Sequence, residues 1–244
     1  MIEAEVDLQT PDGVMPTFTT CPDEGGPFPA VFFYMDAPGM REELRDMARR
    51  IATAGYYVAM PNLYYRWKPD FALDFQTGAN RDEMFELMGR LSNAMVSDDT
   101  RVLFEHADAS PHADGARVGC LGYCMSGPFA LTVAATHADR MRCAASLYGV
   151  ALATDAEDSP HLGFPKTKGE IYVAAAETDE YAPPAMIERV EAAIAESGVR
   201  GRVEWYPGTD HGFAFPTRGG VFDKPAAERH WSRLFALFAR NLGG

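Results

Sequence analysis

The chain has 244 residues, of which 47% are hydrophobic and 11% aromatic, so it can bury one large core and we expect a single domain over residues 1–244. Its formal net charge of -13 argues against nucleic acid and against anionic membrane surfaces as partners. No stretch approaches the roughly 18 apolar residues of a membrane-spanning helix, and the first residues lack the pattern of a signal peptide.

The N-terminal part of the chain alternates between strand and helix patterns. Residues 2–8 and 14–20 alternate apolar and polar side chains around a Pro-Asp-Gly turn, which predicts a β-hairpin. Residues 28–34 form a nearly continuous apolar run, which is typical of a strand buried on both faces. Residues 40–54 have helical apolar spacing, and residues 56–60 read as the next strand.

Residues 62–80 form an irregular segment that is rich in aromatic side chains. Residues 81–106 have a helical pattern, with a break expected near Ser97. An apolar run over residues 117–121 then leads into a helix over residues 128–136.

The rest of the chain continues the alternation. We expect strands over residues 141–148, 170–175 and 202–206, helices over residues 183–196 and 224–241, and a polar connection over residues 149–168. Alternating strands and helices predict an α/β fold with a mostly parallel central sheet and helices on both of its faces. Active sites in such sheets lie at the carboxyl ends of the strands.

The segment Gly122-Tyr123-Cys124-Met125-Ser126-Gly127 stands between a predicted strand and a predicted helix. A sharp strand-to-helix turn needs small residues on both sides, and it exposes the side chain at its apex above backbone N–H groups. The apex residue is most often serine. Here it is Cys124, which we interpret as a nucleophile.

Two further strand ends supply partners for this thiol. Asp179 follows the strand over residues 170–175, and His211 follows the strand over residues 202–206. The order nucleophile, acid, histidine is that of the α/β-hydrolase triad. A histidine base would activate Cys124, and the carboxylate would orient the ring. Glu177, Glu180 and Asp210 are the neighbouring acids that we place second to Asp179.

An acyl-transfer site also needs donors for the developing oxyanion. The N–H of Met125, directly after the nucleophile, is one candidate, and the N–H of Ala37, after the strand over residues 28–34, is the other.

The four cysteines are Cys21, Cys120, Cys124 and Cys143. They are sparse and form no C-x-x-C pair, so we expect neither a disulfide framework nor a zinc site. The chemistry of the predicted triad needs no metal and no organic cofactor. A reducing cytoplasm is the expected location, and a monomer or small homo-oligomer is the expected assembly.

These residues resemble the dienelactone hydrolase (carboxymethylenebutenolidase) family. The resemblance rests on Gly122-Tyr123-Cys124, Asp179 and His211, together with the strand running into Pro61-Asn62-Leu63-Tyr64, and it covers nearly the whole chain. It implies the α/β-hydrolase fold and hydrolysis of a lactone through an acyl-enzyme. It also implies an acidic residue that contacts the resting thiol; members typically have glutamate, and this chain has Asp36.

The resemblance implies two arginines for a substrate carboxylate. One corresponds to Arg81, but the position four residues past the histidine is Phe215 rather than arginine. An apolar wall at Phe215, with Tyr64, Tyr65, Trp67 and Phe71 nearby, would favour a less charged, larger or aromatic ester; these aromatic residues could equally be ordinary packing.

The sequence favours a hydrolase acting on a small-molecule ester or lactone. One alternative is a general carboxylesterase or thioesterase on a neutral or aromatic ester. Another, of a different class, is a non-catalytic binding protein or a thiol redox sensor that uses Cys124.

Overall fold

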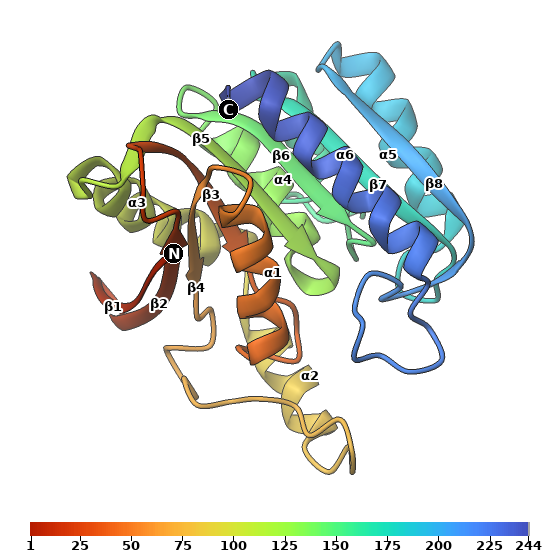
Figure 1. The fold of residues 1–244 in the computed structure, drawn as a ribbon. Coiled ribbons are helices and arrows are strands. Elements are labelled where there is room, and N and C mark those ends of the chain that lie inside the picture. The colour runs from red at the N-terminus through yellow and green to blue at the C-terminus, as the bar shows by residue number, and fades with distance from the viewer. Residues whose placement is uncertain (244) are drawn as a thin grey trace.

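An eight-stranded sheet with the order β1-β2-β4-β3-β5-β6-β7-β8 forms the centre of the computed structural model, which describes residues 1–243 (Figure 1). The strands are β1 (Ile2–Thr10), β2 (Gly13–Cys21), β3 (Phe28–Tyr34), β4 (Tyr57–Pro61), β5 (Ala113–Tyr123), β6 (Met141–Leu147), β7 (Glu170–Thr178) and β8 (Gly201–Asp210). Strands β3 to β8 pair in parallel, while β1 with β2 and β2 with β4 pair antiparallel. The predicted hairpin and the mostly parallel sheet are confirmed.

The helices cover both faces of this sheet. They are α1 (Glu42–Ala52), α2 (Arg81–Arg90), α3 (Asn93–Ala109), α4 (Gly127–Thr136), α5 (Pro184–Ser197) and α6 (Lys224–Leu242), with short 3₁₀ turns η1 (Cys124–Ser126) and η2 (Pro160–Lys166). Figure 1 shows α1 and α6 in front of the sheet and α3 and α4 behind it. Strands covered on both faces must be apolar throughout, which explains why six of the seven residues of β3 are buried.

Two predicted boundaries differ from the structure. The break in the helical segment lies between α2 and α3, not near Ser97. The Ser92 hydroxyl accepts a hydrogen bond from the Met95 N–H at 3.2 Å and so begins α3, whereas Ser97 lies buried within that helix. The polar connection over residues 149–168 contains η2, which the sequence pattern did not indicate.

The carboxyl ends of β3, β5, β7 and β8 lie at one edge of the sheet because these strands are parallel. The irregular segment 62–80, α2 and the loop 212–223 extend from that edge (Figure 1). None of the helices within residues 1–243 is long and apolar enough to cross a membrane.

Candidate active site

Cys124 sits at the apex of a strained strand-to-helix turn between β5 and α4. Its φ of 54° lies in the left-handed region, which non-glycine residues rarely occupy. A Cβ added at Gly122 would lie 2.1 Å from the Ser126 backbone oxygen, so only glycine fits before the apex. The side chain of Cys124 remains partly accessible, while Cys21, Cys120 and Cys143 are buried. The predicted elbow is therefore present.

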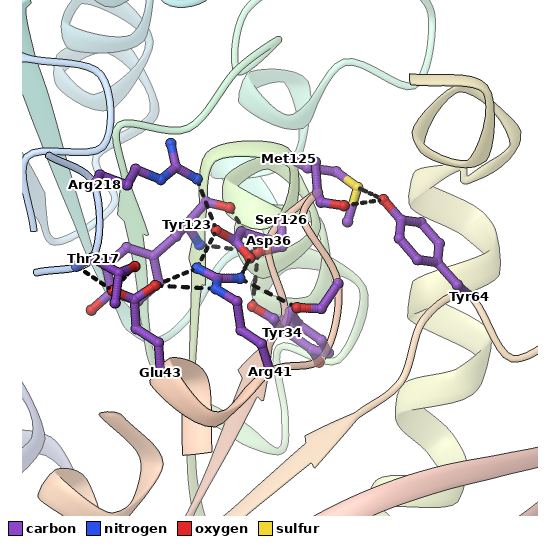
Figure 2. Close-up of polar contacts among 12 residues, drawn as sticks. Tyr34, Asp36, Arg41, Glu43, Tyr64, Tyr123, Met125, Ser126, Thr217 and Arg218 are labelled. Carbon is purple, nitrogen blue, oxygen red and sulfur yellow. Dashed lines mark hydrogen bonds and ion pairs between the residues drawn. The ribbon is translucent and has the colours of Figure 1, made fainter. Parts of the chain in front are cut away.

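Ser126, two residues past the apex, stabilises the turn. Its hydroxyl accepts a hydrogen bond from the Tyr123 N–H at 3.0 Å and lies 2.9 Å from the Tyr34 carbonyl oxygen at the end of β3 (Figure 2). The residue is completely buried, so these contacts also satisfy its polar atom. The serine thus joins the elbow to the neighbouring strand.

The structure brings Asp179 and His211 together. The Nδ1 atom of His211 lies 2.7 Å from the Asp179 Oδ2 atom, and the Asp179 side chain is completely buried. The other oxygen of Asp179 accepts hydrogen bonds from the N–H groups of Tyr181 and Ala182. These bonds hold the carboxylate still, and the carboxylate in turn fixes the orientation of the imidazole ring.

The environment of His211 favours its protonated form. Burial of the ring opposes the charge, but hydrogen bonds with Asp179 and Cys124 outweigh it and raise the pKa of His211 to about 9. The ring also packs edge-on between the rings of Tyr148 and Tyr181, both with centroids 5.1 Å away. At neutral pH the His211 ring beside Cys124 is therefore an imidazolium.

Cys124 and His211 both open into a cavity of about 840 Å³. Its walls come from the segments after β3 and β4, from α2, from the start of α5 and from the loop after β8. The lining includes Ala37, Leu73, Phe75, Arg81, Met84, Phe85, Met88, Val150, Tyr181, Met186, Arg218 and Val221. Most of these side chains are apolar, as in pockets for small organic ligands.

Arg81 is the predicted substrate-binding residue that reaches this cavity. Its guanidinium lies 3.4 Å from the Tyr181 hydroxyl and 5.6 Å from the centre of the Phe85 ring. Within residues 1–243 it forms no ion pair with a carboxylate. It is therefore a cationic group with donors available to a ligand.

Asp36 is completely buried, and its carboxylate is held by two arginines (Figure 2). One oxygen lies 2.5 Å from Arg41 Nη1, and the other lies 3.1 Å from Arg41 Nη2 and 3.2 Å from Arg218 Nη2. No hydrogen bond joins Asp36 to Cys124 in the part of the chain that the structure describes. The expectation that Asp36 contacts the resting thiol is thus not met, because the guanidinium groups engage its carboxylate instead.

Glu43 extends this cluster to the loop that follows His211. It accepts hydrogen bonds from Arg41 Nε and Nη2, and its Oε1 atom accepts bonds from the backbone N–H and the hydroxyl of Thr217. The cluster of Asp36, Arg41, Glu43 and Arg218 has two charges of each sign and is neutral as a whole. It fixes the loop 212–223, and with it Arg218, against the end of β3 (Figure 2).

Arg218 is a cavity residue that the sequence reasoning missed. Every nitrogen of Arg41 has a partner, whereas Arg218 donates only to Asp36, and its Nε atom is buried without a partner within residues 1–243. An arginine therefore does line the cavity, seven residues past His211 rather than four. A search of the whole loop for a cation would have found it.

Tyr64 contacts both residues that carry the predicted oxyanion donors, Ala37 and Met125. The Tyr64 hydroxyl donates to the Ala37 carbonyl oxygen at 2.9 Å and lies 3.4 Å from Met125 Sδ (Figure 2). Tyr64 is completely buried and does not line the cavity, so its predicted contact with substrate is wrong. Its position ties the segment after β3 to the elbow.

Phe215 and Trp67 also lie away from the cavity. Phe215 is completely buried against Tyr123 and Tyr148, with the guanidinium groups of Arg41 and Arg218 over its ring at 5.0 and 4.9 Å. Trp67 packs near Arg90. The predicted apolar wall at Phe215 is therefore wrong, since this ring supports the two arginines from beneath.

No group of three or more His, Cys, Asp or Glu side chains within residues 1–243 is arranged to hold a metal ion. The cavity lining carries a thiol, an imidazole, two guanidinium groups and the carboxylate of Asp74.

Comparison with known proteins agrees with this architecture. The carboxymethylenebutenolidase of Pseudomonas putida is 25% identical over 209 residues, 85% of this chain and 84% of that protein. A Methylorubrum extorquens protein provisionally named a carboxymethylenebutenolidase is 28% identical over 96% of this chain and 79% of its own length. A Klebsiella pneumoniae crystal structure, provisionally named a dienelactone hydrolase, shares the fold with a TM-score of 0.87, 24% identity and 98% coverage of each chain.

The model of the dienelactone hydrolase family matches residues 15–242, which is nearly the whole chain. The protein therefore belongs to the dienelactone hydrolase family, α/β-hydrolase enzymes that act on ester bonds.

Proposed function

We propose that this protein hydrolyses a carboxylic ester or lactone through an acyl-enzyme on Cys124. The observation that carries the proposal is the hydrogen bond between His211 and Asp179, 2.7 Å long, beside a thiol at a strained elbow in the same cavity. A nucleophile, a base and an orienting carboxylate in this arrangement have the roles of a hydrolytic triad.

In the first step the sulfur of Cys124 attacks the carbonyl carbon, and the π electrons of the C=O bond move to oxygen. The N–H groups of Ala37 and Met125 stabilise that oxyanion. When the tetrahedral intermediate collapses, the bond to the alcohol oxygen breaks and His211 gives its proton to that oxygen. A thioester on Cys124 results; with a lactone, the alcohol stays attached to the acyl group.

In the second step His211 takes a proton from a water molecule, which attacks the thioester carbonyl. The carbon–sulfur bond breaks, the carboxylic acid leaves, and the thiolate is restored beside the imidazolium. Asp179 keeps the ring in one tautomer and stabilises its charge throughout. Neither step consumes a reagent other than water.

Arg81 is the proposed anchor for an acidic group on the substrate, because within residues 1–243 it lines the cavity and forms no ion pair, whereas Arg218 pairs with Asp36. Asp36 has a supporting role in this proposal: it holds Arg41 and Arg218 in place instead of acting on the sulfur. The substrate is a small molecule.

The test is hydrolysis of a cis-dienelactone and of p-nitrophenyl acetate by the wild type and by Cys124→Ala, with Cys143→Ala as a control at a buried cysteine remote from the cavity. Turnover that disappears in Cys124→Ala and persists in Cys143→Ala supports the proposal. Turnover that persists in Cys124→Ala rules out Cys124 as the nucleophile. Turnover of p-nitrophenyl acetate alone would keep the triad but exclude the dienelactone as substrate.

A further inference from the structure

One face of α2 forms an apolar wall of the active-site cavity. Met84, Phe85 and Met88 line the cavity together with Arg81, and their spacing of three, four and seven residues from Arg81 places them on one side of the helix. An apolar helix face normally packs on the core. Here that face lines the cavity instead, and Phe85 is 37% exposed.

Other elements complete the wall. Phe75 comes from the segment before α2, Tyr181 from the loop after β7, and Met186 from α5. Phe75 is 46% exposed and Tyr181 is 40% exposed. Large apolar side chains that gather around one opening and remain exposed usually mark a binding surface, because covering them releases water from apolar surface.

The cavity is also large for a small substrate. Its volume of about 840 Å³ lies in the upper part of the range, roughly 300–1,000 Å³, in which proteins bind ligands of drug size. An acetyl ester or a single-ring lactone at Cys124 would leave most of this wall uncovered. Methionine side chains adapt to ligands of different shape, and three of them line this space.

We infer that the substrate carries a bulky apolar group of aromatic size, which binds between α2 and the start of α5 while its ester carbonyl lies at Cys124. This inference rests on the proposed hydrolysis at Cys124 and adds the class of substrate. Phe85 and Met88 are then specificity-determining residues. The predicted preference for a larger or aromatic ester is retained, but with residues of α2 in place of Phe215 and Trp67.

The experiment compares esters that differ in apolar size; the leaving group is identical within the acyl series, and both leaving groups of the alcohol series are primary alcohols. One series varies the acyl group, p-nitrophenyl acetate against p-nitrophenyl 4-phenylbutyrate; the other varies the alcohol, methyl acetate against 2-naphthylmethyl acetate. The wild type should prefer the larger ester of at least one series by about tenfold or more in kcat/KM, because apolar contacts in a pocket discriminate by factors of this order. Phe85→Gln should reduce that preference several-fold.

Leu162→Gln is the matched control, since Leu162 is an exposed apolar residue of η2 that does not line this cavity. It should leave the preference unchanged. Equal kcat/KM values for small and large esters in both series, or a preference that Phe85→Gln does not alter, would overturn the inference while leaving the hydrolytic proposal intact.

A binding measurement separates the two proposals if no ester is hydrolysed. Titration calorimetry with 4-phenylbutyrate and 2-naphthylmethanol, the products of the larger esters, uses Cys124→Ala as the receptor. Binding that Phe85→Gln weakens would support the apolar site although the proposed chemistry had failed. Absence of binding by both compounds would overturn the inference as well.

Discussion

The imidazole of His211 and the carboxylate of Asp179 lie 2.7 Å apart although 32 residues separate them in the chain. Strands β7 and β8 pair in parallel, so the loops that follow them meet at one edge of the sheet. Burial lowers the pKa of His211, but the interactions with Asp179 and Cys124 raise it by more, to about 9. The pH dependence of the reaction therefore reports on the contact between His211 and Asp179.

Replacing Asp179 should change the alkaline limb of the pH profile. His211 carries its proton below a pH of about 9 and loses it above, and protonation of an alkoxide leaving group requires that proton. In Asp179→Asn a hydrogen bond to the imidazolium is weakened while burial still opposes its charge, so the limb of kcat/KM should move to lower pH. The measurement is kcat/KM for a lactone or alkyl ester from neutral to alkaline pH.

Asp210→Asn is the control for this profile, because Asp210 is the exposed neighbour of His211 in sequence. It should leave the limb in place. A limb that stays at the same pH in Asp179→Asn would show that Asp179 does not set the protonation of His211.

Arg41→Gln should destabilise the fold strongly. Removing one partner of a buried ion pair leaves an uncompensated charge, which costs about 3–5 kcal/mol. Asp36 keeps Arg218, so we expect the lower end of this range. The free energy of unfolding in urea would show it, with Arg45→Gln, whose pair with Glu5 is exposed, expected to lose about 0.5 kcal/mol. Similar losses for both variants would contradict the proposed supporting role of the Asp36 cluster.

Tyr64→Phe should lower kcat by about tenfold with little change in KM, because small displacements of oxyanion donors are costly while Tyr64 does not line the cavity. Tyr65→Phe serves as the control: its hydroxyl contacts Thr10 and Asp99, away from Cys124. A change confined to KM in Tyr64→Phe would place Tyr64 against the substrate after all.

Phe215→Leu should lower stability without changing substrate preference. The ring is completely buried beneath two guanidinium groups, and loss of a well-packed aromatic side chain costs about 1–3 kcal/mol even with a large aliphatic replacement. Denaturant unfolding and the ratio of kcat/KM for the large and small esters are the measurements. A shifted ratio at unchanged stability would return Phe215 to the substrate site.

The sheet could be predicted because its strands follow simple patterns. The apolar run of β3 reports burial on both of its faces. The alternation of β1 and β2 predicted the strands but not their burial, since β1 is largely exposed and the last five residues of β2 are all buried. The elbow at Cys124 could be predicted because its geometry demands small residues at fixed positions. The break between α2 and α3 was misplaced, because both Ser92 and Ser97 are able to cap a helix and only the packing of Ser97 decides between them.

The cavity walls could not be predicted to the same degree. Which aromatic side chains of the segment 62–80 face the site depends on how that segment folds: Tyr64 turns inward to Ala37, while Phe75 faces the cavity. Arg218 belongs to no motif, and its place follows from the bonds of Thr217 to Glu43. Long-range contacts of this kind leave no periodic signal in a sequence.

The most direct test of the central claim is to identify the residue that carries the acyl group during turnover. The reaction with p-nitrophenyl acetate would be quenched in acid within the first turnovers, and the digested protein examined by mass spectrometry. The account predicts acetylation of the peptide that contains Cys124, with increased accumulation in His211→Gln, in which deacylation lacks its base. Acetylation of another residue, or full turnover with no acylated peptide, would contradict it.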